Sequence, residues 1–268
     1  MRLYFFIGGM PEAVRTYAET ENMLEVEKVH NAILTSFKYD LAKYGTRKQQ
    51  EYLNECLEYV AGNIGRKVKY VNINKNAHSK YLKEALLKLE LSRIIHLVRR
   101  TGSSKVPISQ FVNKDAFKSI FLDIGLVCSM AGIKLHDIKQ LIVDFEGALA
   151  EQFIGQELLT TFEYFNDARL YYWSREKKNA NAEIDYLYQV KNNIYPIEVK
   201  AGKTGTLKSL QVYLGDKHQK TGIRFNLDVP SVGHKLTANI NINGIMQEVE
   251  YSLISMPLYL AYYLKQLI

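Results

Sequence analysis

The chain has 268 residues, of which 47% are hydrophobic and 24% are charged, an ordinary composition for a globular protein of one large or two small domains. The formal net charge is +7. The opening MRLYFFIGGMPEA holds a single Arg and an apolar run too short to span a bilayer, which excludes a secretory signal, so we expect a cytoplasmic protein with no membrane contact.

Lys and Arg are concentrated in one region of the chain. Residues 41–120 hold 16 Lys and Arg against 6 Asp and Glu, whereas residues 1–40 hold 4 against 6 and residues 121–268 hold 15 against 16. Because the excess is regional, it favours a basic patch over a generally solubilising surface, and DNA is the partner that we expect.

The first 40 residues are apolar at their start. We expect a strand or helix end over residues 3–10, a turn at Gly8-Gly9, and a new helix from Pro11, followed by helical segments to Phe37. So apolar a beginning needs a partner to cover it, which is typical of the tail of something larger.

Residues 41–135 follow the order of a winged helix-turn-helix. The apolar spacing predicts helices over 48–64 and 79–91 with a basic connector between them. A strand at 94–98, a basic tip at 99–105 and a returning strand at 106–112 complete the motif. The alternative is a helical subdomain with a solvated basic face. The residues expected to contact DNA phosphates are Arg66, Lys67, Lys69, Lys80, Lys83, Arg99, Arg100 and Lys105.

The rest of the chain alternates helices and strands, the pattern of an α/β unit. A strand entering a helix is expected over 117–126. The further predicted elements are a helix at 145–165, a strand at 169–173, a hairpin at 183–200, a helix at 205–215, a strand at 222–227 and a helix at 257–267. The polar, Asn-rich residues 229–250 predict a loop or weak strands.

The hairpin carries the candidate site. Asp185 stands on its first strand, and Glu198 and Lys200 share one side of the second strand, with Glu151 on the preceding helix. Two carboxylates on adjacent strands suit Mg²⁺, so Asp185 and Glu198 are the expected metal ligands. Lys200 can orient the attacking water and stabilise charge in phosphodiester hydrolysis. The alternative is an amphipathic hairpin whose solvated face is charge-paired.

Other motifs are weaker. Gly202-Lys203-Thr204 ends like a P-loop, but position 197, where that motif needs its first glycine, is Ile, so we expect no ATP site. The six histidines have no spacing suited to zinc. Cys56 and Cys128 each lie in an apolar context, which predicts two buried thiols in a reducing compartment.

Residues 145–215 resemble the PD-(D/E)XK nuclease superfamily, especially archaeal Holliday-junction resolvase-like members. Those proteins have a core helix with a Glu, a strand with an Asp and a strand with E-x-K. The resemblance implies that Glu151 is the helix acid, that Asp185 and Glu198 are the metal ligands, and that Lys200 is the catalytic lysine.

More broadly, IGGMPEAV, FLDIGL, EGALAEQFIGQEL, EIDYL and PIEVKAG resemble a prokaryotic family in which a C-terminal domain follows an AAA-type ATPase. That resemblance implies a helical remnant of the ATPase junction at 1–40, a winged-helix-like basic domain at 41–135 and a nuclease-like α/β domain at 136–268. The Walker A motif of that ATPase is absent from this sequence.

Three functions stay open at this point. The first, which we favour, is a DNA-binding module of an ATPase-family protein that recognises DNA without cutting it. The second is an active Mg²⁺-dependent DNA endonuclease with Glu151, Asp185, Glu198 and Lys200 as catalytic residues. The third is a protein–protein interaction domain whose charge is incidental.

Overall fold

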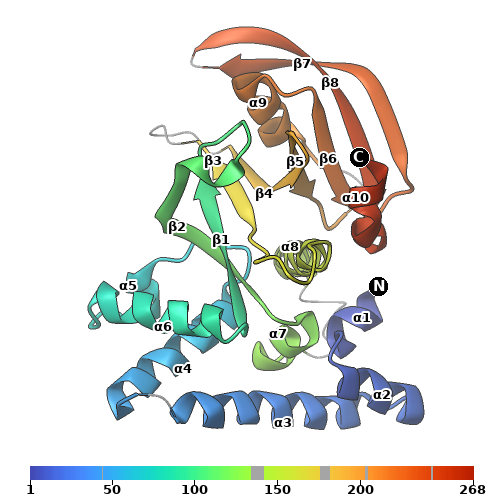
Figure 1. Ribbon diagram of the computed structural model, residues 1–268. Coiled ribbons are helices and arrows are strands. Elements are labelled where there is room, and N and C mark those ends of the chain that lie inside the picture. The colour runs from blue at the N-terminus through green and yellow to red at the C-terminus, as the bar shows by residue number, and fades with distance from the viewer. Residues whose placement is uncertain (44, 134–141, 176–181, 203–204, 243) are drawn as a thin grey trace. The chain divides into compact units, whose positions relative to one another are not determined.

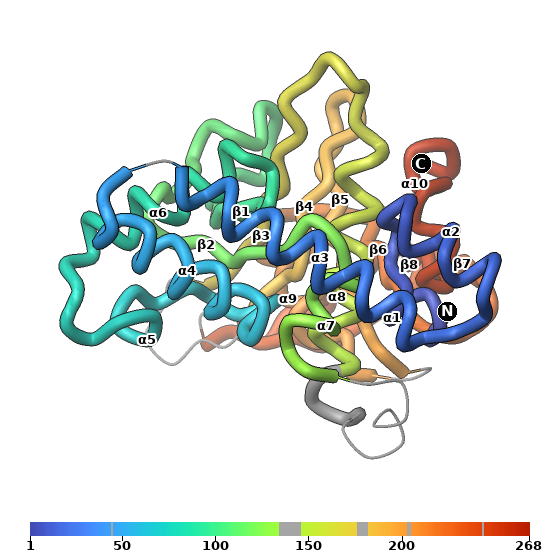
Figure 2. The backbone as a smooth tube through the Cα atoms, turned by 90° about the horizontal axis from the view of Figure 1, so that it is seen from below, coloured from blue at the N-terminus to red at the C-terminus, as the bar shows by residue number. Residues whose placement is uncertain are grey.

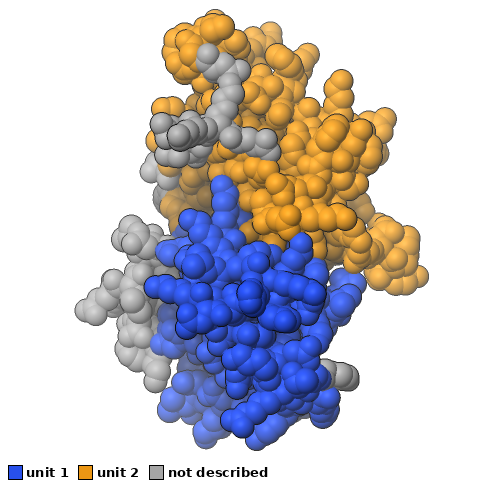
Figure 3. All heavy atoms as spheres, turned by 90° about the vertical axis from the view of Figure 1, so that its left-hand side faces the viewer, with its two compact units in different colours: residues 1–97, 118–152 blue, residues 98–117, 153–268 orange. Residues whose placement is uncertain are grey.

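The computed structural model describes residues 1–43, 45–133, 142–175, 182–202, 205–242 and 244–268. The chain forms two compact units, unit 1 with residues 1–97 and 118–152 and unit 2 with residues 98–117 and 153–268 (Figure 3). Its helices and one mixed eight-stranded sheet confirm the α/β class. The units differ from the three predicted segments, because residues 1–40 and 41–97 belong to the same unit. The predicted boundary at 135/136 lies outside the described residues.

Unit 1 is mainly helical. Its helices are α1 (Arg2–Ile7), α2 (Pro11–Thr20), α3 (Met23–Ala42), α4 (Arg47–Gly62), α5 (Tyr70–Ile73), α6 (Ser79–Leu91) and α7 (Ile124–Met130) (Figure 1). A capping box between Thr46 and Gln49 starts α4, and the apolar stripes of α4 and α6 bury Leu57 and Leu86 among others. None of the helices described is long and apolar enough to cross a membrane.

The turn at Gly8-Gly9 holds α1 against α7. Asp123 caps α7 by accepting a hydrogen bond from the Leu126 N–H (3.1 Å), and its other oxygen accepts one from the Gly9 N–H (2.7 Å). Gly8 has φ +71°, and a Cβ there would overlap the Asp123 carboxylate. Figure 2 shows α7 beside α1 and α3. The predicted turn and the predicted helix from Pro11 are therefore confirmed, and residues 2–7 are a helix.

Two strands and one helix run from one unit into the other: β1 (Ile95–Thr101), β2 (Val112–Phe121) and α8 (Ile142–Thr160). The predicted basic tip at 99–105 is wrong in part. Arg99 and Arg100 lie within β1, where they pair in parallel with Tyr171 and Tyr172, and the partner strand is β2 instead of residues 106–112. A short 3-10 helix, Ile108–Phe111, precedes β2.

Unit 2 is built on the sheet, whose strand order is β2-β1-β3-β4-β5-β6-β8-β7. The further elements are β3 (Tyr171–Ser174), β4 (Glu183–Val190), β5 (Asn193–Val199), α9 (Lys208–Lys217), β6 (Thr221–Asn226), β7 (Ser231–Ile242), β8 (Ile245–Pro257), a 3-10 helix (Leu258–Tyr263) and α10 (Leu264–Leu267) (Figure 1). β5, β6 and β8 are parallel, and β4 is antiparallel to β5.

The sequence left residues 229–250 open between a loop and weak strands. They form most of β7 and β8, an antiparallel pair of strands. Ile240 and Ile242 of β7 are buried, and a Cβ on Gly215 of α9 would overlap both side chains and Val249. Because α9 packs this closely on β7 and β8, the alternate apolar residues of these strands are covered, although residues 229–250 are polar on average.

The core of unit 2 gathers between α9 and one face of the sheet. It contains Trp173 and Tyr213, whose rings meet edge to face at a centroid distance of 5.1 Å. Leu210 and Leu214 extend this core along α9. Because this core covers one face of the sheet, it determines toward which face the polar residues of β5, β6 and β8 point.

Candidate functional site

The predicted hairpin is present as β4 and β5. Its pairs run from Tyr186–Ile197 to Val190–Asn193, and continuing this register by one residue brings Asp185 opposite Glu198. The turn residue Lys191 has φ +51°, so the chain reverses where the sequence predicted it. The structure therefore places Asp185, Glu198 and Lys200 at the same end of two adjacent strands of unit 2.

Asp185 has a structural contact within the hairpin. Its Oδ2 accepts a hydrogen bond of 2.8 Å from the Val199 N–H, and the residue is partly buried. This bond fixes the carboxylate beside the backbone of β5, between the positions of Glu198 and Lys200.

Glu198 and Lys200 form a close ion pair. Lys200 Nζ donates to Glu198 Oε1 over 2.5 Å. The Lys200 side chain is 28% exposed and the Glu198 side chain is 8% exposed. Lys200 continues the β5–β6 pairing through its N–H, which donates to the Phe225 carbonyl at 2.8 Å. Because the pair is largely shielded from water, the lysine holds the Glu198 carboxylate in one orientation.

Glu151 belongs to unit 1, where its partner is Lys118. Lys118 Nζ lies 2.8 Å from Glu151 Oε1, and the two side chains are 2% and 14% exposed. The neighbouring Gln152 exchanges two hydrogen bonds of 2.8 Å with the backbone of Phe121. Within unit 1, α8 is thus tied to β2 by polar contacts, and Glu151 takes part in them.

Two further polar residues stand on the same row of the sheet as Glu198, and the sequence did not single them out. Glu198 pairs with Arg224 of β6, and Arg224 pairs with Ser255 of β8. Arg224 Nε donates to Ser255 Oγ over 3.0 Å. The sequence signal is a charged residue within the mostly apolar strand GIRFNL, and its neighbours can be identified only once the strand register is known.

Asp185 and Glu198 are the donor set that the structure offers to Mg²⁺. Among the residues described, no group of three His, Cys, Asp or Glu side chains could hold a metal ion by itself. Two carboxylates on adjacent strands nevertheless suit Mg²⁺, which usually keeps several waters and is completed by substrate phosphates. Asp185 and Glu198 therefore offer the type of oxygen ligand that Mg²⁺ prefers.

The basic residues of unit 1 surround α5 and α6. Residues 63–88 contain seven Lys and Arg and one acid, Glu84. Arg66, Lys67, Lys69 and Lys80 are exposed and Lys83 is half-buried. Lys75 and Lys88 are exposed as well and extend the predicted set. The cations of this segment that make no ion pair with any described residue are Arg66, Lys69, Lys75, Lys80 and Lys88.

The other predicted DNA contacts lie in unit 2. Arg99 and Arg100 are half-buried in β1, and Lys105 is exposed in the loop before the 3-10 helix. The strand position of the two arginines restricts their side chains to the faces of the sheet, so they cannot form the flexible tip that the sequence predicted.

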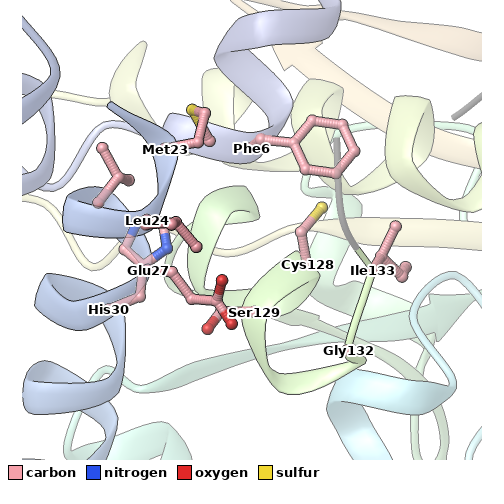
Figure 4. Close-up of a pocket in the computed structure, with 10 residues that line it drawn as sticks. Phe6, Met23, Leu24, Glu27, His30, Cys128, Ser129, Gly132 and Ile133 are labelled. Carbon is pink, nitrogen blue, oxygen red and sulfur yellow. The ribbon is translucent and has the colours of Figure 1, made fainter. Parts of the chain in front are cut away.

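Unit 1 also contains a pocket of about 310 Å³ (Figure 4). Its lining is mostly apolar, with Phe6, Met23 and Cys128 among its walls. His30 is 2% exposed, and its Nε2 donates to the Ile7 carbonyl at 3.0 Å. Glu27 is the single carboxylate of the lining, so the pocket presents little polar chemistry.

Two comparisons with domain families give matches. Residues 1–137 match the domain of unknown function DUF8612, and residues 146–242 match the domain of unknown function DUF4143. No curated protein and no solved structure matches the chain.

Proposed function

Since this chain belongs to the DUF8612 family and its second part matches DUF4143, a domain that typically follows AAA ATPase domains, we propose that it is the DNA-binding module of an ATPase-family protein. The module recognises DNA through unit 1 and carries a nuclease-like hairpin in unit 2. It has no ATP site of its own.

The observation that carries the proposal is a set of five exposed cations within residues 63–88, namely Arg66, Lys69, Lys75, Lys80 and Lys88. These five cations make no ion pair with the described residues, whereas the exposed Lys28, Lys43 and Lys48 of the same unit each contact a carboxylate. Exposed cations without internal ion pairs are suited to phosphate contacts, since binding them to DNA releases counterions without breaking internal pairs.

The arrangement of the elements supports these cations as part of a winged-helix-like surface. α4, the short α5 and the basic helix α6 are followed by the neighbouring strands β1 and β2. Lys67 makes an isolated antiparallel bridge to Lys118 of β2, so the segment between α4 and α5 pairs with this strand. Helix, connector, basic helix and two strands is the order in which winged helix-turn-helix proteins present a recognition helix.

Binding of a short fluorescent DNA duplex, measured by anisotropy over a range of salt concentrations, tests the proposal. Each phosphate contact adds about 0.9 to the slope of log affinity against log salt concentration. The variant Arg66→Ala, Lys69→Ala, Lys80→Ala should bind more weakly and with a slope smaller by up to about 2.7. The matched control is Lys28→Ala, Lys43→Ala, Lys48→Ala, which removes the same charge from ion-paired positions and should keep the slope.

Failure of the wild-type chain to bind duplex or branched DNA would sink the proposal and favour a protein–protein interaction domain. Equal slopes for the two triple variants would show that the surface of residues 63–88 is not the DNA contact.

A second candidate function, hydrolysis of DNA, is favoured by the geometry at β4 and β5. The close pairing of Lys200 with Glu198, and the hydrogen bond from the Val199 N–H to Asp185, support the roles that the D…E-x-K resemblance implies. The order α8, β3, β4, β5, α9, β6 agrees with that resemblance. Mg²⁺, when bound, would polarise the phosphate and lower the pKa of a water. Asp185 and Glu198 would hold it, and Lys200 would orient the water and stabilise developing negative charge.

Incubation of duplex and four-way-junction DNA with Mg²⁺ or Mn²⁺ separates the two candidates. Cleavage that Lys200→Met abolishes would establish the endonuclease. Binding without cleavage, for every DNA substrate and metal ion tried, would support the DNA-binding module instead of the endonuclease.

A further inference from the structure

The polar row formed by Glu198, Arg224 and Ser255 contains an unusual cation. Arg224 is half-buried in the middle of β6, a strand whose other residues are apolar or small except at its ends. Its register partners are Glu198 on one side and Ser255 on the other. Partners in register share one face of the sheet, so the three side chains stand side by side.

The carboxylate beside Arg224 is engaged by a different cation. Glu198 Oε1 accepts from Lys200, whereas Arg224 makes no ion pair with any carboxylate of the described residues. Arg224 Nε instead donates to the Ser255 hydroxyl, which is 2% exposed. This contact fixes the plane of the guanidinium and leaves its two terminal nitrogens for another group.

Among the residues described, this half-buried guanidinium has a neutral hydroxyl as its hydrogen-bond partner and forms no ion pair, so it has lost hydration without a counterion bound to it. The planar fork of arginine matches the two free oxygens of a phosphate, which it can bind in a bidentate manner. Lys200, on the same face and diagonally next to Arg224, adds a second positive charge. Glu198 is directly beside Arg224 in the row, and Asp185 is one strand further along it, so both carboxylates lie on the side of Arg224 away from Ser255.

The position in the sheet supports a ligand as well. β5, β6 and β8 are parallel and end at Val199, Asn226 and Pro257. In sheets with parallel strands, ligands bind beyond the carboxyl ends of the strands, because the chain there turns away and leaves the strand ends accessible. Lys200 directly follows the end of β5, and Arg224 lies two residues before the end of β6.

We propose that Arg224 of unit 2, held by Ser255 and supported by Lys200, binds a phosphate group of the DNA. The inference rests on the proposed DNA-binding function and adds a second contact with the DNA to it. It makes Arg224 a phosphate-binding residue that places a backbone phosphate next to the Asp185, Glu198 and Lys200 cluster.

The test compares Arg224→Gln with Arg224→Lys in the full chain. Arg224→Gln should weaken binding of a short fluorescent duplex by about tenfold at low salt and lower the salt slope by about one. Arg224→Lys should keep the slope but recover only part of the affinity, because an ammonium cannot bind bidentately. Arg169→Gln, which removes an exposed arginine of the same unit that is paired with Asp167, should change neither.

Inorganic phosphate gives a second measurement that does not depend on DNA. Phosphate should raise the Tm of the wild-type chain above its value in chloride at equal ionic strength, and Arg224→Gln should lose this gain. An Arg224-dependent gain without any DNA binding would uphold the anion site and defeat the proposed function. Unchanged DNA affinity, salt slope and phosphate response in a folded Arg224→Gln protein would overturn the inference while the DNA-binding proposal stands.

Discussion

Lys118 of β2 and Glu151 of α8 form a buried ion pair with an Nζ–Oε1 distance of 2.8 Å. Glu151 is the residue that the nuclease resemblance names as the helix acid, and in unit 1 its carboxylate neutralises a lysine that is 2% exposed. Burying a lysine so completely requires a partner, since an unpaired charge in the interior is strongly unfavourable. Glu151 therefore has a structural role whatever its role in chemistry.

Removal of either partner should destabilise the protein. We expect Lys118→Ala and Glu151→Ala each to lower the free energy of unfolding by about 3 kcal/mol, because each leaves a buried charge without its counterion. Urea denaturation followed by circular dichroism measures the change. The control is Lys265→Ala, which breaks the exposed pair with Glu163 and should cost less than about 1 kcal/mol. An unchanged stability of Lys118→Ala would contradict the structural role.

The contact between Gly8 and Asp123 predicts a cost for any side chain at position 8. Gly8→Ala places a Cβ on the Asp123 carboxylate and puts alanine at φ +71°, so we expect about 2–3 kcal/mol of destabilisation. Gly132→Ala is the matched control. Gly132 has φ +67° but open space around it, so only the backbone strain of about 1 kcal/mol should appear. Equal losses in the two variants would mean that the carboxylate can move aside.

Periodicity in the sequence was sufficient where one face of an element is buried by its own unit. The helix α6 runs from Ser79 to Leu91 as predicted, and the hairpin of β4 and β5 turns at Lys191 as predicted. In both cases the apolar residues recur with the period of the element, so the local pattern and the final burial agree.

The pattern failed where burial is decided by distant residues. For residues 229–250 the polar pattern left a loop and weak strands both open, and the packing of α9 on Ile240 and Val249 makes most of them the strands β7 and β8. Arg224 was missed for the same reason, since its neighbours Glu198 and Ser255 are 26 and 31 residues away and only the sheet register brings them together. Non-local pairing of this kind leaves no periodic trace in the sequence.

His30 predicts a loss of stability in acid. Burial lowers the pKa of His30 below its ordinary value of 6.5, although the hydrogen bond to Ile7 and the charges of Asp123 and Glu27 act in the opposite direction. A depressed pKa means that the unfolded chain binds the proton first, so the contribution of His30 to stability is present above pH 6.5 and declines as the pH falls below it.

The free energy of unfolding should therefore decrease more between neutral pH and about pH 5 for the wild-type chain than for His30→Gln. His234→Gln, at an exposed position, is the matched control for the substitution itself. Parallel curves for the wild type and His30→Gln would show that the buried imidazole titrates normally.

The two cysteines predict slow thiol chemistry. Burial raises the pKa of Cys56 and of Cys128 to about 12, and both are free thiols, as the sequence predicted. The thiolate is the reactive form, so Ellman's reagent should react slowly with the native chain and completely in denaturant. Rapid reaction of one thiol in the native state would reveal local opening around it.

Asp185 allows its structural and chemical roles to be separated. Its Oδ2 accepts from the Val199 N–H, so Asp185→Ala should cost about 1–2 kcal/mol of stability by leaving that donor in a largely buried strand without its acceptor. Asp185→Asn keeps an acceptor oxygen and should be nearly as stable as the wild type, yet it removes the negative charge that Mg²⁺ needs.

If the chain binds DNA without cutting it, Asp185→Asn should bind duplex DNA with wild-type affinity or better, because a negative charge near the phosphates is lost. A Tm increase with Mg²⁺ that disappears in Asp185→Asn, together with cleavage that disappears with it, would instead assign the carboxylate to hydrolysis. Anisotropy, thermal denaturation and gel cleavage assays on the same two variants distinguish these results.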